Sequence, residues 1–290
     1  MTMRIAVIGL GQMGGGIACN LSADDSFAVT VYDLNSDAME RCVRAGATGA
    51  ISASKAVCDV DVVITSLPMP ETVLAVFAAE LDRSPEGTIW MDVSTIDPHT
   101  ASELETMASS AGRDFIACPL GKGPAQAEAG TLPLFVGCRE HLLQAMYPVF
   151  NCIGENLHYL GTPAAACTFK IVSNMVGMAN LSVLAEGYAL CSRLGVADHA
   201  FSSALEDTGA WSNQAELRLP WMMDGDFDNR FGVDLAVKDV RLAVEAAARA
   251  NVPSPVGASG LMQLVAASAK GWGEEDVDAV LKVVDAAKCC

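Results

Sequence analysis

The stretch Gly9-Leu10-Gly11-Gln12-Met13-Gly14 joins two segments of different character. The continuous apolar run 5–8 before it predicts a buried strand, and the segment 12–21 that it opens predicts a helix. A second strand, predicted over 28–32, ends at Asp33. A G-x-G-x-x-G pattern alone is weak evidence. Strand, glycines, helix, strand and terminal carboxylate within one short unit predict a dinucleotide-binding motif.

Each glycine of this motif has its own physical role. Gly9 allows a tight turn, Gly11 lets a diphosphate approach the backbone, and Gly14 lets the helix pack closely on the strand. The unpaired N–H groups and the positive dipole end of the helix then face the phosphates. Asp33 would accept hydrogen bonds from the adenosine ribose and repel a 2′-phosphate, so we expect NAD rather than NADP, although the nearby Asn35 could tolerate some NADP. The alternative is a glycine-rich turn that binds nothing.

Composition narrows the possible partners. The chain has 290 residues, a mean hydropathy of +0.32 and a net charge of −17, so it is long enough for two domains with a large core. The negative charge argues against nucleic acid or an anionic membrane as a partner. An anionic substrate would need a basic group placed locally in its pocket.

Cysteine usage and hydropathy bear on the compartment. The ten cysteines include no C-x-x-C pair and no zinc-ligand spacing, so we expect free thiols, a reducing compartment and no metal site. We expect no function for the terminal pair Cys289-Cys290. The uncharged run 171–185 is too short and too polar to span a bilayer. These observations predict a cytoplasmic protein without a membrane span.

Strands and helices alternate in the first half of the chain. Beyond Asp33 the sequence predicts strands over 60–66, 88–93, 115–118 and 134–136, and helices over 36–45, 72–79, 98–111 and 139–150. Strands that are apolar throughout imply that both faces of the sheet are covered. The fold class predicted is therefore α/β, with a Rossmann-type, doubly wound and mostly parallel sheet.

Strands are absent from the prediction for the second half. Thr162-Pro163 predicts the start of a long helix that runs to about Arg193. Further helices are predicted over 197–207, 234–250, 256–269 and 274–287. We therefore expect a dinucleotide-binding domain over 1–161 and an all-helical substrate and oligomerisation domain over 162–290, joined by the long helix.

Three groups of residues suggest catalysis. The segments 67–70 and 92–95 each follow a predicted parallel strand, at the sheet edge where ligands bind. Lys170 and Asn174 project from one face of the long helix, and apolar neighbours would lower the pKa of the lysine toward values suited to proton transfer. Lys238 and Asp239 form a charged pair. Taken singly, these could be ordinary turns, a solvent-directed lysine with a packing asparagine, and a surface ion pair.

Taken together and in order, these motifs resemble the β-hydroxyacid dehydrogenase family over essentially the whole chain. The resemblance implies a Rossmann domain and a helical domain, with the active site in the cleft. It implies that Lys170 is the catalytic general acid and base and that Asn174 assists it. It further implies a homodimer or homotetramer. Cofactor contacts are implied for the residues Gly9, Gly11, Gln12, Met13, Gly14, Asp33, Leu67, Pro68, Ser94, Thr95 and Lys238.

One loop departs from the family pattern. The family usually has Ser-Gly-Gly after Pro119-x, where backbone N–H groups hold the substrate carboxylate, but this chain has Gly121-Lys122-Gly123. Sulfolactaldehyde reductases depart similarly, with Gly followed by Arg. We therefore expect Lys122 to reach an anionic group of the substrate, either a carboxylate or a sulfonate; a solvated loop lysine is the alternative. The substrate-binding residues expected are Ser94, Gly121, Lys122, Gly123, Lys170 and Asn174.

The function implied is an NAD-dependent oxidoreductase that interconverts a small 3-hydroxy acid, bearing a primary alcohol, and its semialdehyde by hydride transfer. Lys170 would exchange the proton with the alcohol oxygen. Two alternatives stay open: a sulfolactaldehyde reductase, and a catalytically inert NAD-binding sensor or scaffold.

Overall fold

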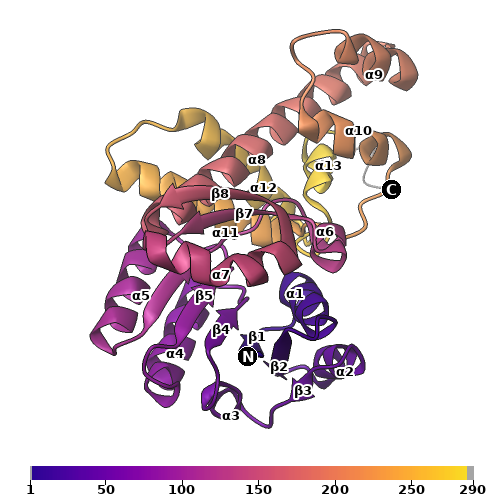
Figure 1. Ribbon diagram of the computed structural model, residues 1–290. Helices are drawn as coiled ribbons and strands as arrows, with labels where there is room; N and C mark the ends of the chain where they lie inside the picture. The colour runs from indigo at the N-terminus through magenta and orange to yellow at the C-terminus, as the bar shows by residue number, and fades with distance from the viewer. Residues whose placement is uncertain (1, 286–290) are drawn as a thin grey trace. The chain divides into compact units, whose positions relative to one another are not determined.

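The computed structural model describes residues 2–285, which divide into two compact units between Lys170 and Ile171 (Figure 1). The division falls inside helix α8, Pro163–Arg193, so this one helix belongs to both units. The residues 286–290, including Cys289-Cys290, lie outside the described part. The functional domain limits 1–161 and 162–290 stay a prediction.

The first unit is built on one eight-stranded sheet with the order β3-β2-β1-β4-β5-β6-β7-β8 (Figure 1). Every neighbouring pair is parallel except β6 and β7. The prediction of a doubly wound, mostly parallel sheet is confirmed. The strands are β1 Met3–Ile8, β2 Phe27–Tyr32, β3 Thr48–Gly49, β4 Val62–Thr65, β5 Ile89–Asp92, β6 Asp114–Ala117, β7 Leu132–Gly137 and β8 Gly154–Gly161.

Helices cover both faces of this sheet. Successive residues of β1 show this directly: Ile5 and Val7 pack into one buried cluster, whereas Ala6 and Ile8 pack into another. Because neither face of residues 5–8 meets water, this part of the strand is apolar throughout, as the sequence indicated. The helical segments are α1 Gln12–Ser22, α2 Ser36–Arg44, α3 Ala53–Val57, α4 Pro70–Glu80, η1 Leu81–Arg83, α5 Pro98–Ser110, α6 Pro124–Ala129 and α7 Glu140–Ile153.

The regular structure of the second unit is helical over its described residues 171–285, as predicted, apart from one isolated bridge between Gly232 and Asp276. Its buried cluster includes Tyr188 of α8, Leu219, Val240 and Leu264. Besides the rest of α8 it contains α9 Asp198–Glu206, α10 Asn213–Asp224, α11 Val233–Arg249, α12 Pro255–Ala269, η2 Val277–Ala279 and α13 Val280–Val284.

Several elements differ from the sequence prediction for physical reasons. Strand β8 was not predicted, because most of its side chains are polar and none is fully buried. Helix α10 was not predicted either; Pro220 lies inside it and hides the helical pattern. The helix expected over 274–287 was wrong at its start: Asp276 accepts a hydrogen bond from the N–H of Asp278, so helical structure begins only at Val277.

Helix α8 is the one helix among residues 2–285 that is long and apolar enough to qualify as a membrane span, and about a third of its most apolar window is buried. Length and composition alone are weak evidence, since a core helix of an ordinary globular protein also qualifies. The absence of a membrane span therefore stays a prediction. The eight described cysteines are free thiols, as expected.

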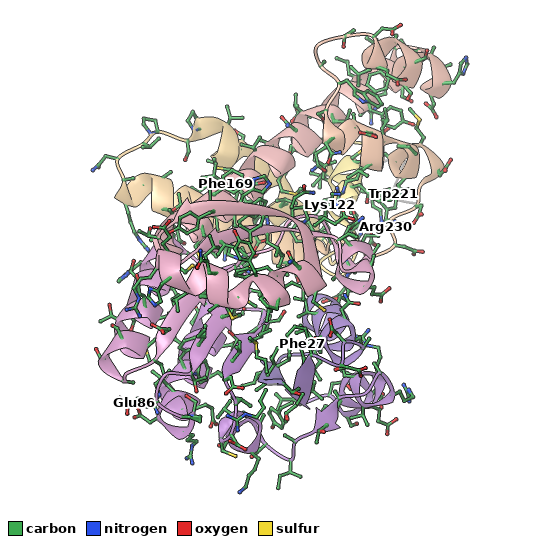
Figure 2. All side chains as sticks on the ribbon, viewed as in Figure 1. Phe27, Glu86, Lys122, Phe169, Trp221 and Arg230 are labelled. Atoms are coloured by element: carbon green, nitrogen blue, oxygen red, sulfur yellow. The ribbon has the colours of Figure 1, made fainter. Side chains whose placement is uncertain are left out.

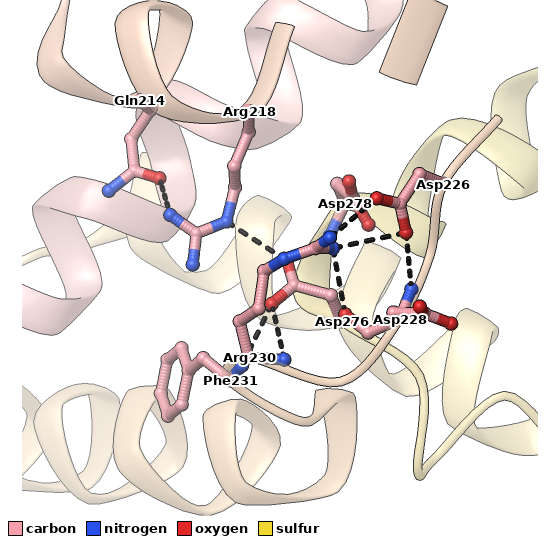
Figure 3. A network of polar contacts seen from close by, with 8 residues as sticks. All are labelled: Gln214, Arg218, Asp226, Asp228, Arg230, Phe231, Asp276 and Asp278. Carbon is pink, nitrogen blue, oxygen red and sulfur yellow. Dashed lines mark hydrogen bonds and ion pairs between the residues drawn. The ribbon is translucent and has the colours of Figure 1, made fainter. Parts of the chain in front are cut away.

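A buried ionic network holds the second unit together around Asp276 (Figure 3). Its carboxylate accepts a bond of 3.0 Å from Arg218 Nε, and bonds of 3.2 and 2.8 Å from the N–H groups of Arg230 and Phe231. Asp276 is completely buried, so these donors compensate for the loss of water around its charge. The network joins α10 to the loop before α11 and to η2.

Asp278 lies in this network without comparable support. It is fully buried, and neither of its carboxylate oxygens has a hydrogen-bond partner among the described residues. Burial, reinforced by the neighbouring Asp276 charge, raises the pKa of Asp278 from 3.8 to about 8. At neutral pH the folded state therefore keeps Asp278 largely protonated, whereas the unfolded state ionises it.

We predict that Asp278→Asn stabilises the protein at alkaline pH. The raised pKa means that the folded state binds a proton that the unfolded state has lost between about pH 4 and 8, so wild-type stability falls as the pH rises through this window. An amide imitates the protonated acid and avoids that loss. Urea unfolding should show the variant more stable than wild type by about 2 kcal/mol at pH 8, and by much less at pH 5.

The exposed Asp228 offers a matched control. Asp228 takes part in the network through its backbone N–H and carbonyl groups, so Asp228→Asn should leave the pH dependence unchanged. Equal stability of wild type and Asp278→Asn at pH 8 would contradict the interpretation of Asp278 as a buried, unsupported acid.

Candidate active site

The glycine motif has the geometry of a phosphate-binding turn. Gly9 has φ +91°, and a Cβ there would collide with the carbonyl oxygen of Ser66. A Cβ on Gly14 would approach the Cβ of Ser66 to 2.7 Å. No atom lies within 4 Å of the position that a Cβ on Gly11 would take. Gly9 and Gly14 are therefore required by packing, while Gly11 leaves open space above the backbone.

The helix that follows presents an uncapped N-terminus. Gly11 is its N-cap residue and has no side chain to accept the first N–H groups, and the first turn contains no acidic residue. Asp33 lies beside the turn: its Oδ2 accepts a bond of 2.6 Å from the N–H of Leu10, and its Oδ1 one of 2.7 Å from the N–H of Asn35. These residues fit a dinucleotide, with the phosphates at the helix N-terminus and the ribose near Asp33. Gln12 is exposed and Met13 half-buried in the first turn.

A hydrogen-bond chain joins the ends of β4 and β5. Ser94 Oγ accepts a bond of 2.9 Å from the N–H of Leu67 and donates one of 2.7 Å to Asp92 Oδ1. Thr65 Oγ1 donates to the same carboxylate oxygen at 2.6 Å. The structure thus brings Leu67 and Ser94 together at the edge where they were expected.

Thr65 and Asp92 fix this edge, and the sequence interpretation gave neither a role of its own. They are the last residues of their strands and lie opposite each other in the register. The sequence did contain a signal for these two residues, because each is a polar residue at the end of an apolar strand. Pro68 is exposed in the first of these loops, and Thr95 is half-buried in the second.

Lys122, whose position is labelled in Figure 2, has a strained backbone conformation in the loop 121–123. This exposed residue has φ +59°, in the left-handed region, which costs a non-glycine residue about 1 kcal/mol. The N–H of Gly121 donates to the carbonyl of Pro133 at 2.8 Å, and that of Gly123 donates to Gln126 Oε1 at 3.3 Å. Both glycine N–H groups expected to hold the substrate are therefore already bonded, which leaves the ammonium of Lys122 as the charged group of the loop.

The start of α8 is anchored to the first unit just before Lys170. Ala166 and Cys167 are buried in the cluster that contains Ile8 and Ile96, with Leu67 packed against it. Burial raises the pKa of the Cys167 thiol well above its usual range, and the charges of Asp92 and Asp97 add to the shift. The anchored turn therefore lies near the carboxyl end of β5.

Lys170 follows this anchor by one turn and is half-buried. The apolar surroundings expected for it are present only in part: Ile171 is buried, but Phe169 and Val172 are 44% and 41% exposed. Phe169 packs edge-on against Phe135, with 4.7 Å between the ring centroids.

In the second unit Asp239 links two of the expected site residues. Its Oδ2 accepts a bond of 2.6 Å from Asn174 Nδ2, and its Oδ1 lies 2.7 Å from Lys238 Nζ. Lys238 and Asp239 are 9% and 2% exposed, so they are not the surface pair considered as an alternative. Asp239 joins α8 to α11 and orients both neighbours; no role had been assigned to it from the sequence.

Two family models match consecutive parts of the chain. One is described as the NAD binding domain of 6-phosphogluconate dehydrogenase and matches residues 4–161; the other is described as NAD-binding of NADP-dependent 3-hydroxyisobutyrate dehydrogenase and matches residues 164–284. The chain belongs to the β-hydroxyacid dehydrogenase family.

Curated relatives and solved structures agree with this family assignment. The 2-(hydroxymethyl)glutarate dehydrogenase of Eubacterium barkeri is 32% identical, over 97% of this chain and 95% of the relative. The 3-sulfolactaldehyde reductase of Escherichia coli K12 is 30% identical, over 97% and 95%. A structure of Mycobacterium tuberculosis 3-hydroxyisobutyrate dehydrogenase with L-serine gives a TM-score of 0.91 at 27% identity and covers 98% of this chain and 99% of that one.

As a β-hydroxyacid dehydrogenase the protein is an oxidoreductase that acts on a CH–OH group with a nicotinamide cofactor, so the predicted reaction class is confirmed. The relatives are consistent with a small substrate. Among residues 2–285 no group of three or more His, Cys, Asp or Glu side chains could hold a metal ion.

Proposed function

We propose that this β-hydroxyacid dehydrogenase interconverts a small 3-hydroxy acid that bears a primary alcohol and the corresponding semialdehyde, with NAD as cofactor. The observation that carries this proposal is the position of Lys170. It follows the turn of α8 that is anchored near the end of β5, in the unit that contains the dinucleotide-binding turn. An inert NAD-binding protein would need neither that lysine nor the buried Asp239 that orients Asn174.

Lys170 is the proposed proton donor and acceptor. In the reductive direction its ammonium gives a proton to the oxygen that becomes the alcohol, and in the oxidative direction the neutral amine takes it back. Asn174 lies four residues further along α8, so it projects from the same side of the helix. The amide is fixed by its bond to Asp239 and therefore offers a pre-oriented polar contact. The nicotinamide, when bound, supplies the redox chemistry.

Asp33 supports NAD rather than NADP. Its carboxylate is held beside the turn by the N–H groups of Leu10 and Asn35. A fixed negative charge at the ribose end favours hydroxyl groups and disfavours a 2′-phosphate. Gly9, Gly11, Gln12, Met13 and Gly14 are proposed to surround the phosphates, with Leu67, Pro68, Ser94, Thr95 and Lys238 as the other cofactor contacts.

Lys122 is the proposed anchor for the anionic end of the substrate. A lysine in the left-handed region is strained, and such strain persists where the position has a function. Lysine acts as a point charge without the two-pronged geometry of arginine, so it accommodates either a carboxylate or a sulfonate. The second candidate function, reduction of sulfolactaldehyde, is favoured by this charged residue in the loop.

Substrate assays with nicotinamide absorbance test the proposal. The panel contains 3-hydroxyisobutyrate, serine, glycerate, 4-hydroxybutyrate, succinic semialdehyde and sulfolactaldehyde, each with NAD(H) and NADP(H). We expect turnover of a carboxylate substrate with NAD(H). Preference for the sulfonate would select the second function, and silence across the panel with NADH still bound would contradict both.

We predict opposite effects of Lys122→Gly on stability and on substrate binding. Removing the strain should raise the free energy of unfolding by about 1 kcal/mol. Losing the ammonium should raise the KM for the anionic substrate roughly tenfold. Asn251→Gly is the matched control, because exposed Asn251 also has a positive φ, of 55°, but lies at the end of α11. It should leave KM unchanged; an unchanged KM in Lys122→Gly would exclude Lys122 from the substrate site.

We also propose a homodimer or homotetramer in the cytoplasm. Val176, Val183 and Leu190 are 51%, 64% and 60% exposed and recur every seven residues along α8. This is the spacing of an apolar seam that packs against another helix.

A further inference from the structure

Arg41 of α2 reaches back to the glycine turn. Its Nη2 donates to the carbonyl oxygens of Leu10 and Gly11, at 3.3 and 3.4 Å. Gly15 makes this possible, since a Cβ there would collide with the guanidinium. Arg41 takes part in no carboxylate ion pair among the residues 2–285.

Arg41 adds positive charge beside the N-terminus of α1. The carbonyl of Gly11 belongs to the N-cap residue of α1, whose N-terminus carries positive partial charge and has no acidic residue in its first turn. A guanidinium beside that end adds a like charge. A phosphate group that lies between or beside the guanidinium and the helix N-terminus is attracted by both.

The backbone of Leu10 relates Arg41 to the ribose end of the proposed cofactor site. Its N–H donates to Asp33 Oδ2 and its carbonyl accepts from Arg41, so the carboxylate and the guanidinium both contact the backbone of one residue. Asp33 is the proposed partner of the adenosine ribose hydroxyls. A phosphate on the ribose 2′ position would therefore lie close to both side chains, repelled by one and attracted by the other.

We propose that Arg41 is a second determinant of cofactor specificity, which binds the 2′-phosphate of NADP and partly offsets its repulsion by Asp33. The inference rests on the proposed cofactor site and deepens it. The protein then binds NADH more tightly than NADPH through Asp33, yet retains measurable affinity for NADPH through Arg41. The guanidinium suits this role because it presents several donors in a planar fork that matches a phosphate.

Cofactor titration tests the proposal without any substrate. The Kd values of NADH and NADPH are measured by nicotinamide fluorescence for wild type, Arg41→Ala and Arg41→Lys. Arg41→Ala should raise the Kd of NADPH at least tenfold, as expected for loss of a charge-assisted contact. The Kd of NADH should change by less than about twofold. Arg41→Lys should give an intermediate Kd for NADPH, because it keeps the charge without the fork.

Arg44→Ala is the matched control. Arg44 lies on the same helix and pairs with Glu40 on the exposed surface, so both Kd values should stay at wild-type level. A thermal melt confirms that each variant is folded, and Arg41→Lys carries the test if Arg41→Ala is not. The role of Arg41 alone would be overturned by any of three results: equal changes in the Kd values of both cofactors, no change in either Kd, or no binding of NADPH by wild type. Failure of wild type to bind NADH as well would overturn the proposed function with it.

Discussion

Replacing Lys170 with alanine should reduce kcat by about 10²- to 10⁴-fold, the range typical of a lost general acid or base. NADH binding should stay within about twofold of wild type, since no cofactor contact is proposed for this side chain. Without the ammonium, the oxygen produced in reduction must take its proton from water. Turnover is followed by nicotinamide absorbance and the Kd of NADH by fluorescence.

A second variant on α8 separates this chemical effect from damage to the helix. Ser173 is exposed on the same helix, and Ser173→Ala should keep wild-type turnover. A variant that keeps more than about a tenth of wild-type kcat would remove Lys170 from the proton transfer.

Local features of the sequence were sufficient to predict the glycine turn. Gly9, Gly14 and Asp33 lie within one strand–helix–strand unit, and their contacts with the turn follow from the backbone of that unit. Leu67 and Ser94 could be brought together as well, because residues that end neighbouring parallel strands meet at one edge. In these cases the rules of helix and sheet geometry connect sequence to position.

Contacts between distant elements could not be predicted in this way. Asp239 meets Asn174 across 65 positions of the chain, and no local rule pairs them. The use of the Gly121 and Gly123 N–H groups by Pro133 and Gln126 depends on how the loop folds back on β7 and α6. Strand β8 is exposed along much of its length, so its pattern carries little of the apolar signal on which the prediction depended.

Asp239→Asn should lower both activity and stability, because an amide cannot replace the two carboxylate oxygens. In wild type one oxygen accepts from Asn174 and the other faces the ammonium of Lys238. The Asn side chain has a single acceptor oxygen. If that oxygen accepts from one neighbour, its NH₂ group faces the other neighbour, which is also a donor. Lys238 is nearly buried and would lose the negative charge of Asp239. We expect kcat to fall roughly 10- to 100-fold through misplacement of Asn174, and stability to fall by about 3 kcal/mol.

A double-mutant cycle shows whether Asp239 acts through Asn174. Wild type, Asn174→Ala, Asp239→Asn and the double variant are compared below their unfolding midpoints, with Glu245→Gln on the exposed side of α11 as the control. If Asp239 positions Asn174, its replacement should cost far less kcat once Asn174 is already absent, so the two effects are strongly non-additive. Additive losses in kcat would mean that Asp239 supports the fold and Lys238 but does not place Asn174 for the reaction.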